Sequence, residues 1–137
     1  MAEEQKQKKR ATTYEAGCHC GYIKFNFTIS PGLDEYEVVN YPEAKDVTWH
    51  NDSRSRCSVY RFNTKEKDQL FCPKCGASIG IDFRETRKTH TYGFSARTIY
   101  DIDLDKLHYR KLHGINLIKP AMDLSGHYWD EEKQEMK

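Results

Sequence analysis

The feature that most constrains the fold of this chain is the presence of two short cysteine pairs that lie far apart in the sequence. Segment 17–21 reads GCHCG and segment 71–76 reads FCPKCG, so each pair is followed directly by glycine. Four thiolates from two such segments can surround one ion tetrahedrally, and Zn²⁺ is the natural ion for such a set. The sequence therefore predicts one structural zinc ion held by Cys18, Cys20, Cys72 and Cys75.

The residues around the first pair favour a metal site. In an extended segment, residues i and i+2 point to the same side, so Cys18 and Cys20 can face one ion while His19 points away. Gly17 and Gly21 let the backbone pass close to the ion or turn sharply.

The second pair has the form of a metal-binding turn. Pro73 fixes φ early in the turn, and Gly76 can take a positive φ after it. Such a turn can aim backbone N–H groups at the thiolate sulfurs. Four thiolates around Zn²⁺ leave a net negative charge, which these N–H groups would offset together with Lys74 or Lys24.

The composition explains why a metal ion would help this chain to fold. The chain has 137 residues, of which 37% are hydrophobic and 31% charged, and its mean hydropathy is -0.90. That length suits one domain with a modest core. Zinc binding contributes on the order of 10 kcal/mol to folding, which is comparable to the net stability of a small domain, about 5–15 kcal/mol.

Two alternatives to a zinc site are open. A CPKC segment can be a redox dithiol of the thioredoxin type, but that motif normally opens a helix, whereas Gly76 and a β run follow it in this chain. The four cysteines can also be plain buried thiols. The fifth, Cys57, follows Arg54 and Arg56 and is either a reactive thiol or a small strand residue. His50 is the one histidine to consider as an extra ligand.

Between the ends of the chain the pattern is mostly that of β-strands. Alternating or short apolar runs predict strands in segments 23–29, 36–39, 47–49, 57–62, 79–83 and 92–96. Helical periodicity is weak, and its best candidate is segment 101–107. The sequence therefore predicts an all-β fold of antiparallel sheets clamped by a four-cysteine zinc site. Residues 14–125 would form the domain, between a disordered basic tail over 1–13 and a disordered polar tail over 126–137.

The charge and the lack of long apolar runs limit the partners. The formal net charge is +1, which gives no general bias toward nucleic acid or an anionic membrane. The run KQKKR at 6–10 is either a nuclear-import or nucleic-acid patch or a solvated tail. No stretch approaches the roughly 20 apolar residues that span a bilayer, and the N-terminal segment is not of the secretory type. We expect an intracellular protein, cytoplasmic with a nuclear location left open, in which thiols stay reduced.

The two cysteine segments and their neighbours resemble a known family. Residues 17–25, GCHCGYIKF, and residues 71–79, FCPKCGASI, are similar to the family of glutathione-dependent formaldehyde-activating enzymes and centromere protein V. The similarity covers residues 15–110. The resemblance implies a β-tent fold of stacked antiparallel sheets around a structural zinc, whose ligands map onto the same four cysteines. It also implies carbon–sulfur lyase chemistry on glutathione adducts, such as the adduct with formaldehyde, at a second zinc.

The chain departs from the family where the second zinc is expected. A middle motif of the form Cys-x-Cys-x-x-Cys should follow EVVN at 37–40, but the chain continues YPEAKD at 41–46 and has no cysteine between Cys20 and Cys57. A short deletion fits this gap, through alternative splicing, a gene-model error or a degenerate paralogue. Sequencing the transcript across the Asn40–Tyr41 junction would distinguish these origins.

Three functions remain open. A catalytic zinc needs about three protein ligands and an open position, and the chain has no evident further set of three. We therefore expect a zinc-binding domain protein of this family without efficient catalysis, with one structural Zn²⁺ and no second, catalytic ion. The alternatives are an active carbon–sulfur lyase on a glutathione-type thiol adduct such as S-hydroxymethylglutathione, with Cys57 as an improvised ligand, and a zinc-ribbon-like module that binds nucleic acid or protein. Neither the catalytic residues nor the oligomeric state follow from the sequence.

Overall fold

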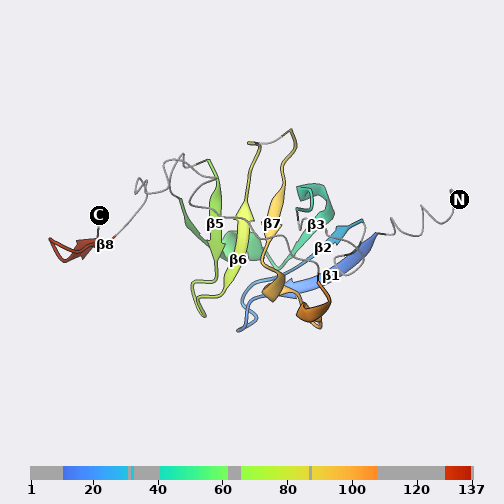
Figure 1. The fold of residues 1–137 in the computed structure, drawn as a ribbon. Coiled ribbons are helices and arrows are strands. Elements are labelled where there is room, and N and C mark those ends of the chain that lie inside the picture. Colours follow the sequence, from blue (N-terminus) through green and yellow to red (C-terminus); the bar gives the residue numbers. More distant parts are fainter. Residues whose placement is uncertain are drawn as a thin grey trace, which may run out of the picture.

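The computed structural model describes residues 11–30, 32, 41–61, 66–86, 88–107 and 129–136. Within these residues the chain forms three antiparallel sheets with the strand orders β1-β2-β3, β4-β5-β6-β7 and β8-β9 (Figure 1). The strands are β1 (Thr12–Gly17), β2 (Lys24–Ile29), β3 (Val47–His50), β4 (Ser58–Tyr60), β5 (Asp68–Phe71), β6 (Ser78–Asp82), β7 (Tyr92–Phe94), β8 (Trp129–Asp130) and β9 (Glu135–Met136). The prediction of an all-β antiparallel fold is confirmed.

Short helical turns join the strands. They are the single-turn helix α2 (Ser53–Arg56) and the 3-10 turns η1 (Ala44–Asp46), η2 (Ala96–Thr98) and η3 (Leu104–Lys106). Segment 101–107, the best candidate for a helix in a sequence with weak helical periodicity, contains only η3, and the side chain of the preceding Asp103 accepts a hydrogen bond from the Asp105 N–H. No helix in the described part of the chain is long and apolar enough to cross a membrane.

Most strands lie where the apolar pattern predicts them. The predictions at 23–29, 47–49, 57–62, 79–83 and 92–96 match β2, β3, β4, β6 and β7, although β4 and β7 are shorter than expected. The predicted strand at 36–39 lies outside the described residues. The sequence missed β1 and β5, because β1 (TTYEAG) ends in small residues and β5 (DQLF) begins with a buried carboxylate, so neither alternates clearly.

Strands extend into both segments that were expected to be tails. Strand β1 begins at Thr12, inside the segment expected as a tail, because Thr12 and Thr13 pair with Ile29 and Thr28 of β2. Residues 129–136, which were expected to belong to the polar C-terminal tail, form the β8–β9 hairpin. The Asp130 carboxylate closes that turn by accepting the N–H groups of Glu132 and Lys133 at 3.1 and 3.0 Å.

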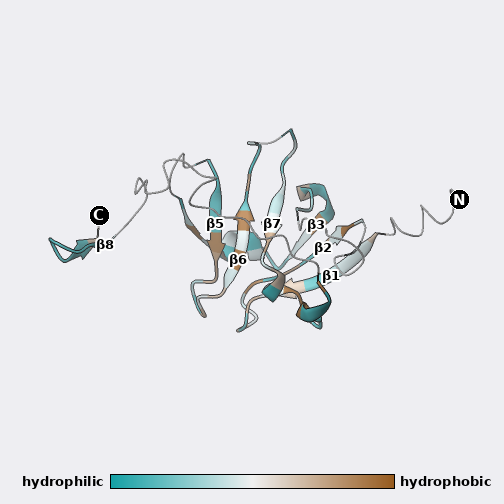
Figure 2. Cartoon of the chain, in the orientation of Figure 1, coloured by the Kyte–Doolittle hydropathy of each residue, from teal (hydrophilic) through white to brown (hydrophobic). Residues whose placement is uncertain are grey.

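The core lies between the two larger sheets and is mainly aromatic. Phe25 and Phe27 of β2 are fully buried, and both contact Phe94 of β7, with ring centroids 4.4 and 5.1 Å apart. Trp49 of β3 lies 4.8 Å from the Phe25 ring. Figure 2 shows hydrophobic segments on β2, β5 and β6, whereas the β8–β9 hairpin is mostly hydrophilic. The aromatic contacts fix the two sheets against each other.

Backbone hydrogen bonds also join the two larger sheets. The segment after β7 returns to the edge of β1, where Ala16 forms a bridge with Ile99 and the Tyr100 N–H donates to the Glu15 carbonyl at 2.9 Å. This returning segment lies beside β1 in Figure 1. It holds the end of β1, where the first cysteine pair begins, next to residues that follow β7.

Candidate metal centre

The structure brings the four predicted cysteines together. Their Sγ atoms all lie within 4.8 Å of one another. The Sγ of Cys20 lies 3.6 Å from that of Cys18 and 3.8 Å from that of Cys72. A tetrahedron with metal–sulfur bonds of about 2.3 Å has edges of about 3.8 Å, so this spacing fits a four-coordinate metal ion. It is far longer than a disulfide bond of about 2.0 Å, and all five cysteines are free.

The first pair reaches the site through a turn and not through strand alternation, which corrects the expected geometry. Strand β1 ends at Gly17, and Cys18 and Cys20 lie in the turn that follows. The Cys18 N–H donates to the Ile23 carbonyl at 3.0 Å, and the Ile23 N–H points back at the Cys18 Sγ at 3.4 Å. Gly21 has φ of 84°, which allows this sharp turn.

The second pair forms the turn that its sequence predicts. The N–H groups of Lys74 and Cys75 point at the Cys72 Sγ at 3.4 and 3.5 Å. The Gly76 N–H donates to the Cys72 carbonyl at 2.8 Å, and Gly76 has φ of 77°. The predicted positive φ and the predicted N–H groups at the sulfur are both confirmed. Such N–H groups spread the negative charge of a thiolate and orient it toward a metal.

Burial and hydrogen bonding make the four thiols unequal. Cys18 and Cys72 are buried, whereas Cys20 and Cys75 are exposed, so the sulfur group is open to solvent on one side. The Ala77 N–H is the main cause that lowers the pKa of Cys75 to about 6. The Tyr22 N–H lowers the pKa of Cys20, but partial desolvation and the neighbouring cysteines raise it to about 11. Without a metal the cysteine thiols therefore hold their protons with unequal affinity. A bound divalent ion would displace these protons.

Two lysines lie near the cysteine turns. The Lys74 ammonium lies 5.7 Å above the centre of the Tyr22 ring, and the Arg56 guanidinium lies 5.0 Å from the same ring. The Cε atom of Lys24 lies 3.5 Å from the position that a Cβ at Gly21 would take. Lys74, which lies within the second cysteine turn, and Lys24, which lies beside the first, are therefore both close to the cysteine turns.

The other candidate ligands lie elsewhere. Cys57 ends α2, and its Sγ donates to the Ser53 carbonyl at 3.5 Å; burial raises its pKa to about 11 although Arg54 lowers it. The Nε2 atom of His50 lies 3.3 Å from a Glu15 carboxylate oxygen. Among the described residues, the four cysteines are the group of His, Cys, Asp and Glu side chains whose spacing fits a metal ion.

A second cluster of polar residues, which the sequence did not predict, lies at the other end of β5. We call it the carboxylate cluster; it comprises Asp68, Asp82, Arg54, Arg61 and His90. Asp68 and Asp82 are directly opposite each other on β5 and β6, and their side chains are only 5% exposed. An Arg54 nitrogen lies 3.0 Å from the Asp82 carboxylate and 3.3 Å from the Asp68 carboxylate, so one guanidinium joins both.

The remaining members complete the pairing of these two carboxylates. Arg61 donates to the other oxygen of Asp68 at 2.7 Å. The Nε2 atom of His90 lies 2.7 Å from Asp82 Oδ1, which also accepts the Arg84 N–H at 2.8 Å. Burial raises the pKa of Asp82, but the Arg84 N–H, Arg54 and His90 together lower it below its ordinary value. The carboxylate cluster therefore keeps Asp82 charged and hydrogen-bonded although its side chain is buried.

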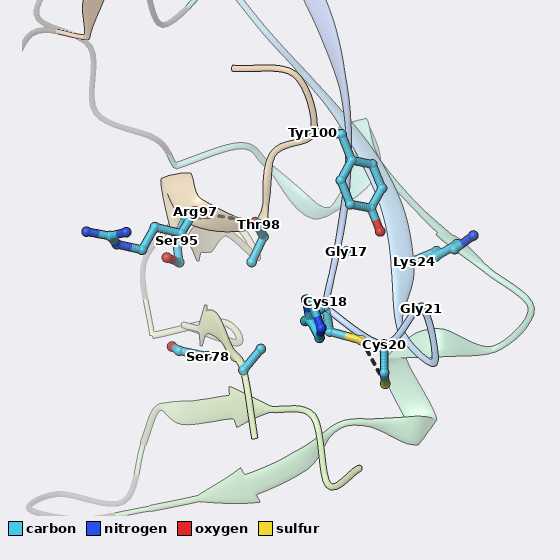
Figure 3. Close-up of a pocket in the computed structure, with 12 residues that line it drawn as sticks. Gly17, Cys18, Cys20, Gly21, Lys24, Ser78, Ser95, Arg97, Thr98 and Tyr100 are labelled. Carbon is cyan, nitrogen blue, oxygen red and sulfur yellow. Dashed lines mark hydrogen bonds between the residues drawn. The ribbon is translucent and has the colours of Figure 1, made fainter. Parts of the chain in front are cut away.

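A cavity of 620 Å³ adjoins the first cysteine turn (Figure 3). One wall comes from segment 17–21 and Lys24 of β2. The opposite wall comes from the start of β6, at Ala77 and Ser78, and from Ser95, Arg97, Thr98 and Tyr100 after β7. His19, which was expected to point away from a metal, is one of the residues that line this cavity. Its volume is in the range of small-molecule sites, about 300–1,000 Å³.

Comparisons with known proteins support the fold alone. No protein-family model matches the chain, and no curated protein matches it. The crystal structure of a Rhodobacter sphaeroides protein, a structural genomics target, is similar with a TM-score of 0.54 and 15% sequence identity. The match covers 66% of this chain and 92% of that chain.

Proposed function

We propose that this chain is a zinc-binding domain in which Cys18, Cys20, Cys72 and Cys75 hold one structural Zn²⁺. The observation that carries this proposal is that two cysteine pairs, 52 residues apart between Cys20 and Cys72, come within 4.8 Å of one another. The first pair follows β1 of the three-stranded sheet, and the second follows β5 of the four-stranded sheet. A bound ion would therefore connect the two sheets.

The donor set favours zinc and a structural role. Four thiolate ligands are typical of zinc or of iron–sulfur centres, and structural zinc sites of this kind are closed and tetrahedral. With four protein ligands the ion has no open position for a substrate. The backbone N–H groups at Cys18 and Cys72 would stabilise the thiolates in the metal-bound state.

The resemblance to glutathione-dependent formaldehyde-activating enzymes and centromere protein V extends this proposal. Under this extended proposal, the two larger sheets correspond to the β-tent of that family, and the four cysteines correspond to its structural zinc site. The chain lacks the middle cysteine motif, and Cys57 is a poor substitute because burial raises its pKa to about 11. We therefore propose a family member without efficient carbon–sulfur lyase activity.

Metal analysis of protein purified without added zinc tests the proposal. We expect close to one zinc per chain, lost together with the fold on treatment with a strong chelator. Metal-free protein that stays folded would contradict it. Two tightly bound zinc ions per chain, with release of glutathione from its formaldehyde adduct, would instead favour the lyase.

A nucleic-acid-binding module is distinguished by its salt dependence. If the chain bound DNA or RNA through its basic N-terminal run, affinity would fall steeply with added salt. We expect no binding at low salt, in line with the net charge of +1.

A further inference from the structure

The ring of Tyr22 links the two cysteine turns by a contact that involves no sulfur atom. Tyr22 lies in the turn between β1 and β2, two residues after Cys20, and its side chain packs against the core while it stays partly exposed. The Lys74 ammonium, which belongs to the turn between β5 and β6, lies 5.7 Å from the centre of this ring. A cation within about 6 Å of a ring centre is attracted to the ring face, so the two turns hold each other at this point.

The single-turn helix α2 fixes Tyr22 in this position. Ser53 of α2 is buried, and its hydroxyl accepts the Lys24 N–H at 2.9 Å, which holds α2 against the start of β2. At the end of α2, Arg56 donates to the Tyr22 carbonyl at 3.2 Å, and its guanidinium lies 5.0 Å from the ring centre. Within the described residues Lys74 forms no ion pair, so the Tyr22 ring is what holds its ammonium in place.

The contact between Tyr22 and Lys74 lies beside the exposed ligands of the metal centre. Each turn supplies one buried and one exposed cysteine, and the exposed ones are Cys20 and Cys75. Lys74 directly precedes Cys75 in the sequence, and Tyr22 follows Cys20 by two residues. In the described part of the chain, no hydrogen bond between backbone groups joins the two turns. A bound ion should be lost first from the exposed sulfurs, through a local opening in which the two turns move apart.

We propose that Tyr22 and Lys74 form a latch that holds the exposed sides of the two cysteine turns together and slows the release of bound zinc. Tyr22 is a positioning residue, because it acts on the metal centre through Lys74. The inference rests on the proposed zinc site and adds to it a contact that controls how long the ion stays bound. The latch acts through the distance between the turns, so it does not depend on the protonation of the sulfur atoms.

Transfer of zinc from the loaded full-length chain to an excess of a chromogenic chelator measures the release rate. Tyr22→Leu keeps an apolar side chain against the core but removes the ring face, and Lys74→Met removes the cation from an exposed position. We expect each variant to release zinc about three- to tenfold faster than the parent, the factor that corresponds to one partly exposed cation–π contact. Tyr22→Phe and Lys74→Arg retain the contact and should release zinc at the parent rate.

A double-mutant cycle distinguishes a latch from two separate structural effects. If both side chains act through one contact, the variant with Tyr22→Leu and Lys74→Met should release zinc no faster than the faster single variant, whereas independent effects would multiply. Lys67→Met is the matched control and should leave the release rate unchanged, because it removes a cation 5.2 Å from the Phe83 ring, at the other end of β5. Effects that multiply, or a Lys74→Met variant that releases zinc at the parent rate, would overturn the inference.

Zinc content, measured on every protein before the release experiment, separates the latch from the proposed function. A parent chain that holds zinc and releases it no more slowly than the Tyr22→Leu and Lys74→Met variants would overturn the latch alone. A folded parent chain without zinc would overturn the proposed function and the latch together.

Discussion

The two ends of β5 each carry a cluster of polar side chains that links the two larger sheets, but the chemistry of the two clusters differs. At one end Asp68 enters the carboxylate cluster, and at the other Phe71 leads into Cys72 and the four-sulfur group. Both clusters link segments from the two larger sheets: α2, which follows β3, supplies Arg54, and the turn after β1 supplies Cys18 and Cys20. Both also bring ionisable side chains from distant parts of the sequence together.

The difference between the clusters is how the negative charge is compensated. The carboxylates are compensated by side chains of the same chain, at distances of 2.7 to 3.3 Å. Among the described residues the contacts to the sulfurs come from backbone N–H groups at 3.4 to 3.5 Å, and in the proposed zinc-bound state the ion would supply the remaining positive charge. One end is therefore complete as folded, whereas under the zinc proposal the other end is completed by the bound ion.

The largest expected effect comes from removing one metal ligand. Cys72→Ser should abolish tight zinc binding and cost on the order of 10 kcal/mol, enough to unfold a domain of this size. Zinc content and thermal unfolding followed by circular dichroism measure this. Cys57→Ser is the control and should retain zinc and cooperative melting, because Cys57 is outside the four-sulfur group. A Cys72→Ser protein that melts like the parent would show that the metal does not hold the sheets.

A smaller effect is expected from the other end of β5. Arg54→Met leaves two carboxylates buried without their shared cation, which should cost about 3–5 kcal/mol. Urea unfolding of the zinc-loaded protein measures the change, and zinc content should stay at the parent level. Adding Asp68→Asn and Asp82→Asn to Arg54→Met should restore part of the loss, since the uncompensated charge is then gone. If the single variant loses zinc as well, the two ends are not independent.

The turn at the end of β1 is expected to be next in size. A Cβ at Gly17 would lie 2.5 Å from the Ile23 carbonyl oxygen and would also press on the Tyr100 hydroxyl. Because the backbone must move, Gly17→Ala should cost about 1–3 kcal/mol and weaken zinc binding. Gly76→Ala meets no atom within 4 Å, so it should cost only the left-handed strain of about 1–2 kcal/mol. Zinc competition titrations against a chelator rank the two variants.

Acid should separate the two ends by a still smaller effect. The pKa of Asp82 is lowered in the folded protein, so its contribution is present above the unfolded carboxyl pKa of about 3.9 and is lost as pH falls through the folded value. The stability difference between the parent and Asp82→Asn should therefore narrow below about pH 4. Comparing the two proteins cancels the proton-driven release of zinc common to both. A difference that does not change with pH would contradict the role given to Asp82.

The smallest effect is expected from Arg61. This side chain is half exposed although it donates to the buried Asp68. Since Arg54 still pairs with Asp68, and water can reach the site that Arg61 leaves, Arg61→Gln should change the urea midpoint only slightly. A loss as large as that of Arg54→Met would mean that the carboxylate cluster acts as one cooperative unit.

The difference between the two ends also explains which parts of the molecule could be predicted. The cysteine turns are local: Pro73, Gly76 and the spacing within each pair determine the backbone that presents the sulfurs, and this was visible in the sequence. The path of the first pair was predicted incorrectly, because strand alternation and a turn after Gly17 both bring Cys18 and Cys20 to one side. Strand β5 was missed because it begins with Asp68, and a carboxylate at that position is typical of a loop. The carboxylate can be buried in a strand because Arg54 of α2 pairs with it.

The amino-acid sequence by itself determined that the fold is β-rich and antiparallel and that four particular cysteines could meet at one ion. Short-range periodicity and turn chemistry carry that information, since they depend on residues within a few positions of one another. Only the tertiary structure decided that Asp68 faces Asp82, that Arg54 reaches both, and that Lys24 and Arg97 flank one cavity. Those pairings depend on strand register and on how two sheets pack, and no local pattern specifies the position of a partner tens of residues away.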